Sequence, residues 1–475
     1  MYNGYIIEIK ELRPHTNADR LQIATIFGSN VVVGLDIKIG DKGIYFPSDG
    51  QLSVEYCEYN NLVRRKDADG NNVGGYLDPD ERNIKAISLR GEKSDGIFMP
   101  LSSLDYCGQV EFEIGDTISV VNGHEICCKY IPRTKNKGFN CNSKTVKKTK
   151  NFVPLFAEHS DTSQLAYNLN QFRDGDQIEI SLKMHGTSQR TAYLPVLQKD
   201  KYNANWFIRT LLKILPTNSK EFSYIKEKFT IPVYEYDYVC GTRRVVLEDF
   251  TGGFYESNGF RKTHHDRFVG KLWKGETVYY EVVGYTETGT PIMSPGSNKK
   301  VSKDFVKKYG DTTEFSYGCE RNGNNEGVDL LETEHSNISG QSIPTSLSRP
   351  KSKLYVYRMT MTTEDGNVIE YSPDFMRYRC EQIGVDTVPV FCKTFINSSI
   401  DDEPGVQVQE LAEQFCGGTD PIGKTHIREG VVVRIVNRPK FTAFKHKNFE
   451  FKVLEGIIKE SADAPDMEEA QEVNI

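Results

Sequence analysis

The sequence predicts an α+β protein in which a small β-barrel precedes a larger mixed domain. Its 475 residues are about three times a typical domain of ~150 residues, so we expect two or three cores. Hydrophobic residues make up 38% and charged residues 26%, which is ordinary globular usage and excludes a mainly disordered chain. Short β-rich runs fill the first ~125 residues, whereas strand and helix patterns mix later in the chain.

We expect the N-terminal domain, residues 1–128, to be an OB-like β-barrel. No long amphipathic helix interrupts its β-rich runs, which favours a closed or partly closed five-stranded barrel, and such barrels commonly bind oligonucleotides. An ordinary barrel in which Asn17, Asp19 and Arg20 only shape a turn is the open alternative. The runs, separated by Gly, Asn and Asp turns, lie at 5–9, 21–27, 30–33, 43–46, 84–89, 96–99 and 111–121.

Charge is unevenly placed along the chain, whose net charge is −7. Residues 129–150 carry eight Lys or Arg and no acid, so we interpret 129–165 as a basic connector. It is either a solvated linker or a segment that follows a nucleic acid, with Tyr130 and Phe139 as stacking surfaces. The last residues, 456–475, form an acidic tail.

The larger domain, 166–455, is predicted to combine antiparallel sheets with flanking helices. One helix is expected at 406–415. A polar surface insertion at 286–352 should hold a short helix near 303–308 and no catalytic residue. The expected strands lie at 177–194, 233–250, 277–285, 353–361, 430–436 and 441–453.

The cysteines and the first residues indicate a soluble protein of the cytoplasm that is not secreted and has no membrane partner. No apolar run is long enough to span a bilayer, and the N-terminus places charges where a signal peptide needs apolar residues. The ten cysteines include no CxxC pair, so we expect free thiols in a reducing compartment. Cys127, Cys128 and Cys141 are expected to be structural, without zinc.

Residues 418–425 fit the phosphate-loop pattern GxxxxGK[ST]. A phosphate loop needs a preceding strand and a following helix, because the helix N-terminus binds the phosphates. Here a helical pattern precedes the loop and a buried strand pattern follows it. We therefore expect the loop only to connect a helix to a strand.

A different segment carries the candidate nucleophile. In the strand pattern at 177–183, Ile178, Ile180 and Leu182 share one face, and Lys183 leaves the opposite face directly before a Gly turn. Both Lys445 and Lys447 also share one strand face, roughly 7 Å apart, and this pair needs an anion between or beside its charges. Phosphates are the natural partner.

Six blocks in one order resemble the covalent nucleotidyltransferases, the superfamily of DNA ligases, RNA ligases and capping enzymes, and are most similar to RNA ligase 2-type enzymes. The stretches 11–34 and 84–101 resemble OB-type tRNA-binding modules and the N-terminal domain of Deinococcus-type RNA ligases. The blocks are Lys183-Met-His185-Gly186, Thr242-Arg243-Arg244, Tyr280-Glu281, Tyr355-Val-Tyr357, Arg428-Glu429-Gly430 and Phe444-Lys445-His446-Lys447.

This resemblance implies an ATP-dependent RNA ligase that joins 5′-phosphate and 3′-hydroxyl ends in RNA repair. Lys183 would attack the α-phosphorus of ATP and form lysyl-AMP, the AMP would pass to the RNA 5′-phosphate, and a 3′-hydroxyl would displace it. The lysines Lys445 and Lys447 would clamp the α-phosphate and complete the catalytic set. The expected partners are nicked duplexes or broken structured RNA, bound by a monomer that suits a phage or bacterial repair enzyme.

The resemblance also implies the nucleotide and metal ligands. Glu281 and Glu429 would associate with Mg²⁺ or Mn²⁺, directly or through water. The expected nucleotide-binding residues are Leu182, His185, Gly186, Ser188, Arg243, Glu281, Tyr357, which would stack on adenine, and Glu429. Three features depart from the pattern or blur it: Ser188 stands where Asn is usual, Leu182 where Glu is common, and Arg244 could take the place of Arg243.

The chemistry requires a perturbed lysine. An ordinary lysine with a pKa near 10.4 is neutral in only about one molecule per thousand at pH 7. We expect nearby Lys445 and Lys447, a metal ion and partial desolvation to lower the pKa of Lys183. Two alternatives remain open: an inactive RNA- or tRNA-binding protein that keeps the fold, and a DNA ligase or GTP-dependent capping-type enzyme.

Overall fold

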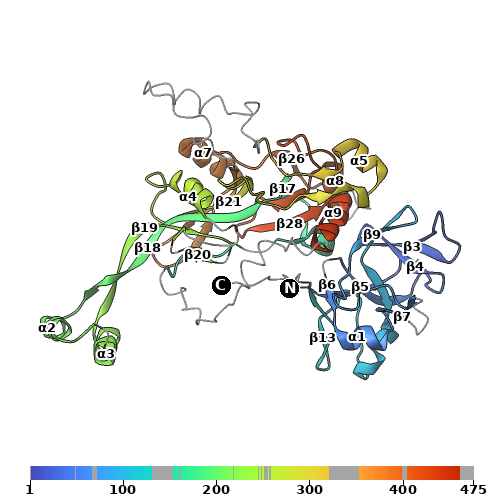
Figure 1. Ribbon diagram of the computed structural model, residues 1–475, viewed down its shortest axis with the longest axis horizontal. Coiled ribbons are helices and arrows are strands. Elements are labelled where there is room, and N and C mark those ends of the chain that lie inside the picture. The colour runs from blue at the N-terminus through green and yellow to red at the C-terminus, as the bar shows by residue number, and fades with distance from the viewer. Residues whose placement is uncertain are drawn as a thin grey trace.

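The computed structural model shows a mixed α+β protein built mainly from antiparallel sheets (Figure 1). An N-terminal unit holds β1 to β15, and a larger unit holds the remaining elements. No helix in the described part of the chain is both long and apolar enough to cross a membrane. The structure describes residues 2–460 except 49, 67–71, 131–152, 160–161, 218, 244, 248, 251–254, 256–257, 320–351 and 398–403.

The N-terminal unit pairs its strands in separate sheets. Its apolar faces form two clusters, around Ile44 and Phe46 in one and Val31 and Tyr45 in the other. Among the described residues these sheets do not join into one closed barrel. The larger sheets are β11(Ile97–Pro100)-β5(Lys42–Phe46)-β1(Gly4–Glu8)-β12(Thr117–Ile118) and β2(Leu12–Pro14)-β3(Leu21–Ile26)-β4(Ser29–Gly34).

Shorter elements complete this unit. The helices described in it are short, α1 (Val54–Tyr59) and the 3-10 helix η1 (Leu101–Cys107), as the sequence predicts. The predicted strand at 111–121 is wrong in its first half, because Gly115, at φ 101°, turns the chain before β12. The remaining strands are β6 (Gly50–Leu52), β7 (Arg64–Lys66), β8 (Asn72–Gly74), β9 (Ala86–Leu89), β10 (Glu92–Asp95), β13 (Val120–Val121), β14 (His124–Glu125) and β15 (Cys127–Lys129).

Two sheets organise the larger unit. The alternation of buried and partly exposed residues along β17 explains why one of its faces packs on the core while the other faces a cavity. The first sheet is β16(Ser163–Gln164)-β28(Thr442–Lys447)-β27(Gly430–Ile435)-β17(Gln177–Lys183)-β26(Val390–Phe395). The second is β20(Val246–Leu247)-β19(Ile231–Gly241)-β18(Thr187–Asn203)-β21(Glu276–Gly284)-β24(Ser352–Thr362)-β25(Val368–Glu370).

Helices and short turns surround these sheets. The helix predicted at 406–415 is α8 (Pro404–Cys416), whereas the strand predicted to run to residue 453 ends at Lys447 and α9 (Phe449–Glu460) follows. The side chain of Asn448 accepts a hydrogen bond from the Glu450 N–H and so starts the helix. The others are η3 (Leu165–Tyr167), η4 (Leu169–Gln171), α4 (Gly259–Asp266) and α7 (Pro373–Ile383).

The described part of the predicted insertion, 286–319, is not a plain surface loop. It holds β22 (Gly296–Ser297), η5 (Asn298–Lys300), β23 (Thr312–Thr313) and the expected short helix, α5 (Lys303–Tyr309). Phe305, Phe315 and Tyr317 are buried in one core cluster with Leu182 of β17. The sequence suggests a loop here because the apolar residues are few and widely spaced. Residues 320–351 lie outside the described residues.

The two units pack against each other. Tyr167 of η3 contacts the rings of Tyr5, Phe27 and Tyr45 of the N-terminal unit. The side chain of Gln409 in α8 donates a hydrogen bond to the carbonyl of Phe27, at 2.8 Å. Most of the predicted basic connector, 131–152, and residues 461–475 of the predicted acidic tail lie outside the described residues.

Beyond the second sheet, β18 and β19 continue as a long hairpin that projects from the body (Figure 1). Two helices close its tip, α2 (Trp206–Ile214) and α3 (Lys220–Phe229). Each starts at a polar residue whose side chain accepts a hydrogen bond from the first turn, Asn205 for α2 and Ser219 for α3. These helices were not predicted from the sequence. We call residues 195–234 the arm.

Candidate active site

The strand register places the three candidate lysines on one wall of a cavity. Lys183 of β17 pairs with Gly430 of β27, and Gly430 pairs with Lys447 of β28. Two residues along, Val432 pairs with Lys445. Because side chains alternate between the faces of a strand, Lys183, Lys445 and Lys447 all face the same side. The predicted alternation along β17 is confirmed: Ile178, Ile180 and Leu182 are buried on the opposite face.

A single carboxylate connects two of these lysines. Lys183 Nζ lies 2.7 Å from Glu429 Oε1, and Lys447 Nζ lies 3.5 Å from the same oxygen. Lys447 Nζ also lies 2.7 Å from Glu455 Oε2, which comes from α9. The anions that the lysine pair needs are therefore partly supplied by the protein itself. Glu429 is 3% exposed, so its charge is stabilised by these contacts and not by water.

These contacts also shift pKa values. Burial alone would raise the pKa of Glu429, but the charges of Lys183 and Lys447 outweigh it and hold this pKa far below its ordinary value. Burial and Lys447 act to lower the pKa of Lys183, but Glu429 outweighs them and the pKa is raised. The predicted lowering of the Lys183 pKa is thus wrong for the protein without a nucleotide, because Glu429 forms the closest contact of the amine.

The second oxygen of Glu429 has a longer contact than the first. Its Oε2 atom is buried without a hydrogen-bond partner among the described residues, and His185 Nδ1 lies 3.5 Å away. Glu281 of β21 lines the same cavity. Two carboxylates that line one cavity, one of them buried, are of the chemical type that a divalent cation such as Mg²⁺ or Mn²⁺ prefers.

The residues after Lys183 are held by close packing. The His185 N–H donates to Tyr317 Oη at 2.7 Å, and the His185 ring meets the rings of Phe315 and Phe451 edge to face, with centroids 4.5 and 4.9 Å away. Gly186 has no room for a side chain, because a Cβ there would lie 2.4 Å from the carbonyl oxygen of Val282. This glycine lets the chain pass from β17 of the first sheet to β18 of the second.

The second sheet supplies the opposite wall. Ser188 of β18 pairs with Glu281 of β21, and Ser188 Oγ lies 2.8 Å from Tyr357 Oη. The ring of Tyr357 meets the ring of His159 edge to face, with centroids 5.0 Å apart. Burial, with help from Arg358, Arg243 and Arg190, lowers the pKa of His159 well below its ordinary value, so this ring is neutral.

All the residues predicted for the site line this one cavity between the two sheets. The side chain of Leu182 belongs to the core, so only its main chain is placed to meet a ligand. Arg244, the alternative to Arg243, lies outside the described residues. The cavity is lined by Leu182, Lys183, His185, Gly186, Ser188, Arg243, Glu281, Tyr357, Glu429, Lys445 and Lys447.

Several solved structures of a Naegleria gruberi RNA ligase have a similar fold. A Naegleria gruberi RNA ligase variant with AMP and Mn aligns with a TM-score of 0.53 at 14% identity, over 94% of this chain and 97% of that one. The same ligase with PPi aligns with a TM-score of 0.51 at 13% identity, over 97% and 98%. The chain has the fold of these RNA ligases. No family model and no curated protein matches the sequence.

Several residues of this cavity were missed by sequence reasoning. Glu179 lines it four residues before Lys183 on the same strand face, so strand periodicity alone could have found it. Its carboxylate binds Arg377 of α7, with the nearest atoms 2.8 Å apart. No local signal points to His159, Phe441 or Arg434, which the fold brings in from separate segments.

The phosphate-loop pattern at 418–425 behaves as predicted, since it joins α8 to β27 in the wrong order for phosphate binding. Its amides are also occupied: the N–H groups of Ile422 and Gly423 donate to Asp420 Oδ1 at 2.8 and 2.9 Å. None of its residues lines the cavity.

The cysteines take no part in the described cavity. Cys127 is buried and Cys128 partly buried, whereas Cys141 lies outside the described residues. One other group combines metal-ligand types: donor atoms of Glu413, Cys416 and His446 lie within 4.8 Å of one another. There the His446 Nε2 and Glu413 Oε2 atoms are 2.6 Å apart, a hydrogen bond that joins β28 to α8.

Proposed function

We propose that this protein is an ATP-dependent RNA ligase that works through a lysyl-AMP intermediate. The observation that carries the proposal is the placement of Lys183 beside Glu429 and Lys447 in one cavity. The shared fold with an RNA ligase supports the same reading. A covalent nucleotidyl transfer needs an amine nucleophile, cations for the phosphates and carboxylates for a metal, and the cavity contains all three.

In the first step, Lys183 Nζ attacks the α-phosphorus of ATP, the bond to pyrophosphate breaks, and the amine loses a proton. Lys445 and Lys447 would bind the α-phosphate oxygens and stabilise the charge that develops on them. Tyr357, beside His159, would contact the base, and Arg243 the ribose or a phosphate. The AMP then passes to an RNA 5′-phosphate, and a 3′-hydroxyl displaces it.

The residues Glu429 and Glu281 would hold the divalent cation. A bound Mg²⁺ or Mn²⁺ would neutralise carboxylate and phosphate charge in this cavity. Glu429 raises the pKa of Lys183 through a contact of 2.7 Å, whereas burial and Lys447 lower it. Engaging the Glu429 carboxylate elsewhere therefore favours the neutral amine that the first step needs.

The N-terminal unit would bind RNA as an OB-like module. Its separate sheets carry two apolar clusters, and it packs on the larger unit through Tyr167 and Gln409. The proposed substrates are nicked duplexes or broken structured RNA. The single-chain active site needs no second subunit, which suits a monomer.

The proposal is tested by sealing of a nicked RNA duplex with 5′-phosphate and 3′-hydroxyl ends, ATP and Mg²⁺. We expect a joined strand, and no joining by the Lys183→Ala variant. Matched reactions with a DNA nick distinguish an RNA ligase from a DNA ligase. Matched reactions with GTP in place of ATP distinguish it from a capping-type enzyme. RNA binding without joining under every condition would favour a non-catalytic RNA-binding protein and contradict the proposal.

A further inference from the structure

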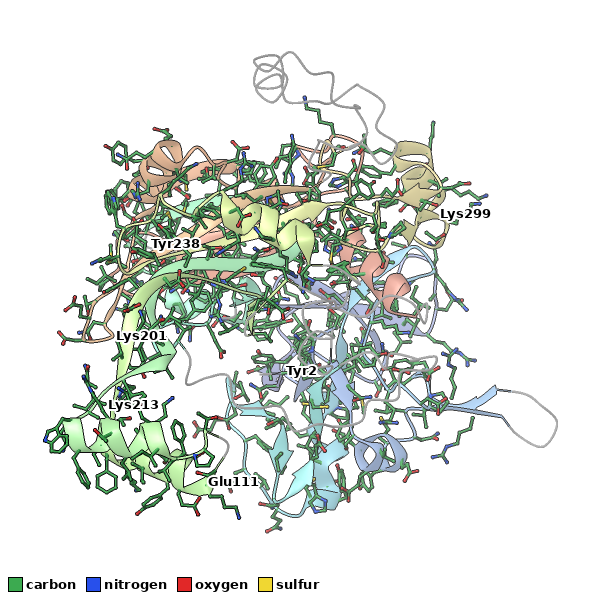
Figure 2. The ribbon with its side chains drawn as sticks, turned by 60° about the vertical axis from the view of Figure 1, so that its left-hand side comes forward. Tyr2, Glu111, Lys201, Lys213, Tyr238 and Lys299 are labelled. Carbon is green, nitrogen blue, oxygen red and sulfur yellow. The ribbon has the colours of Figure 1, made fainter. Side chains whose placement is uncertain are left out.

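The arm is a structural feature that the active site does not use. Its strands pair as far as Asn203 and Ile231, and α2 and α3 close the tip away from the body (Figures 1 and 2). Lys201 and Lys213 are both on it in Figure 2. Leu212 is the buried core of the helix pair. So small a core leaves most of the apolar side chains at the tip in solvent.

Large apolar side chains are exposed along the arm. Trp206 is 77% exposed, Phe207 61%, Tyr224 59% and Phe229 56%. Two aliphatic residues, Ile214 and Ile231, are also exposed. Such a concentration is unusual on a water-facing surface and marks a site that binds something. Four of the six are aromatic, so they offer flat faces for stacking.

The arm is basic, although the chain as a whole is acidic. Between residues 201 and 231 stand six Lys or Arg and two Glu, a local net charge of +4 in a chain of net charge −7. The cations include Arg209 and Lys213 of α2 and Lys220 and Lys228 of α3, all exposed. Local charge of this sign favours a polyanion.

A hollow near the base of the helix pair is lined by both aromatic and basic side chains. It lies between β18, β19 and α3 and is lined by Lys201 and Lys226 together with Tyr202 and Tyr234. Lys226 Nζ lies 5.4 Å from the centre of the Tyr202 ring. Tyrosines and lysines are the side-chain types that stack on the bases and contact the phosphates of a single strand. Glu227 also lines the hollow, and Lys201 Nζ lies 2.8 Å from Glu235 Oε2, so Lys201 would exchange this carboxylate for a phosphate.

One strand, β18, connects the candidate active site to the arm. β18 begins at Thr187, beside Ser188 in the cavity, and runs for 17 residues. At about 3.3 Å per residue, the hollow near Leu197 lies roughly 30 Å and the tip roughly 50 Å from Ser188. A strand of about 15 nucleotides, stacked at ~3.4 Å each, covers the longer distance.

We propose that the arm binds single-stranded RNA that flanks the ends to be joined, through stacking on its exposed aromatic residues and phosphate contacts with its lysines and arginines. This inference rests on the proposed function and deepens it by assigning a substrate-binding surface. The charge of the arm favours RNA over a protein partner, because five of the six cations between residues 201 and 231 are lysines and Lys is depleted in protein–protein interfaces.

Direct binding of fluorescent single-stranded RNA of about 30 nucleotides tests the surface. Trp206→Ala should weaken binding by roughly 5- to 100-fold, the effect of losing one stacked base. Arg209→Ala with Lys213→Ala should lower the slope of log Kd against log salt by about 1.4, which is ~0.7 for each lost phosphate contact. The matched controls are Tyr378→Ala, another exposed aromatic residue, and Lys303→Ala with Lys307→Ala on α5.

Length dependence and lysyl-AMP formation separate this inference from the proposed function. Ends flanked by only about 8 nucleotides are too short to reach from the cavity to the tip, so the arm variants should join such ends as the unchanged protein does. The same variants should form lysyl-AMP normally. Absence of lysyl-AMP in the unchanged protein refutes the proposed function, while normal binding of long RNA by the arm variants refutes this inference alone.

Two further outcomes would overturn the inference. Trp206→Ala could abolish self-association in size-exclusion chromatography, or binding to phosphatidylserine vesicles, with no change in RNA affinity; the surface would then serve a second copy or a membrane. A crosslinking experiment uses the unchanged protein, so its result does not require that a variant folds. RNA with photoreactive bases should crosslink to peptides from 201–231 of the unchanged protein, and crosslinks confined to other regions contradict the proposal.

Discussion

Among single residues, Glu429 and Lys447 have opposite effects on the pKa of Lys183, the candidate nucleophile. A carboxylate 2.7 Å from the amine keeps the pKa of Lys183 raised, despite burial and despite Lys447. The lysine pair predicted to activate the nucleophile therefore cannot do so alone. Under the proposed function, we expect activation of Lys183 to include engagement of Glu429 by another partner.

The Glu429→Gln substitution tests this competition. Removing the negative charge should lower the pKa of Lys183, because burial and Lys447 then act unopposed. Formation of lysyl-AMP should still fall by roughly 10- to 100-fold, since the variant loses a candidate metal ligand. Acetylation of Lys183 as a function of pH, measured by mass spectrometry, reports the first effect.

The control for this measurement is Glu455→Gln, which removes a carboxylate 2.7 Å from Lys447. It should leave the pKa of Lys183 closer to that of the unchanged protein. An unchanged Lys183 titration in the Glu429→Gln variant would show that this contact does not set the pKa.

Gly186 provides a steric test. A Cβ at this position would lie 2.4 Å from the carbonyl oxygen of Val282 and 2.7 Å from Val283 Cγ1. Gly186→Ala should therefore lower the free energy of unfolding by about 1–3 kcal/mol, as overpacking does, and reduce lysyl-AMP formation. At Gly417 a Cβ would meet nothing within 4 Å, so Gly417→Ala serves as the control in urea unfolding. Equal stability of the two variants would contradict the packing described here.

At the scale of elements, the loop 418–425 shows that a matching pattern does not make a phosphate site. Lys424 has a φ of 57°, a conformation that glycine adopts without strain. Lys424→Gly should change the free energy of unfolding by no more than about 0.5 kcal/mol, the range of ordinary surface substitutions. The affinity for ATP should stay within about twofold. Isothermal titration with ATP measures this, and a large loss of affinity would restore the phosphate-loop reading.

Strand periodicity predicted the elements that carry the site, because Lys183, Lys445 and Lys447 alternate with buried residues on strands whose register is regular. It could not predict His159 or Phe441, whose approach depends on the fold of distant segments. It also missed α2 and α3, which pack mainly against each other at the end of the arm and whose apolar residues stay largely exposed. Segment 286–319 was predicted to be a surface loop, but a few of its aromatic residues, such as Tyr317, are buried and anchor it to the core.

At the scale of the whole molecule, buried histidines should set the response to acid. Burial lowers the pKa of His264 to about 3 and also lowers the pKa of His159, His265 and His426. The unfolded chain binds protons on these groups below about pH 6.5 while the folded chain does not, so stability is lost as the pH falls through this range. Each of these histidines lowers the free energy of unfolding by up to ~2 kcal/mol as the pH falls from 6.5 to 5.

Urea unfolding at several pH values checks this dependence. The His264→Gln variant should lose less stability on acidification, with a slope flatter by up to ~1.4 kcal/mol per pH unit. His124→Gln, at the surface of the N-terminal unit, is the matched control. An unfolding free energy that does not change between pH 6.5 and 5 would show that the folded protein accommodates charged histidines.

The most direct test of the central claim is to find where AMP attaches. The full-length protein is incubated with ATP and Mg²⁺, digested under conditions that preserve the phosphoramidate bond, and mapped by mass spectrometry. We expect AMP on Lys183, no AMP on the Lys183→Ala variant, and AMP retained on the Lys424→Gly variant. AMP on another lysine, or none on the protein while RNA ends are still joined, would contradict the account.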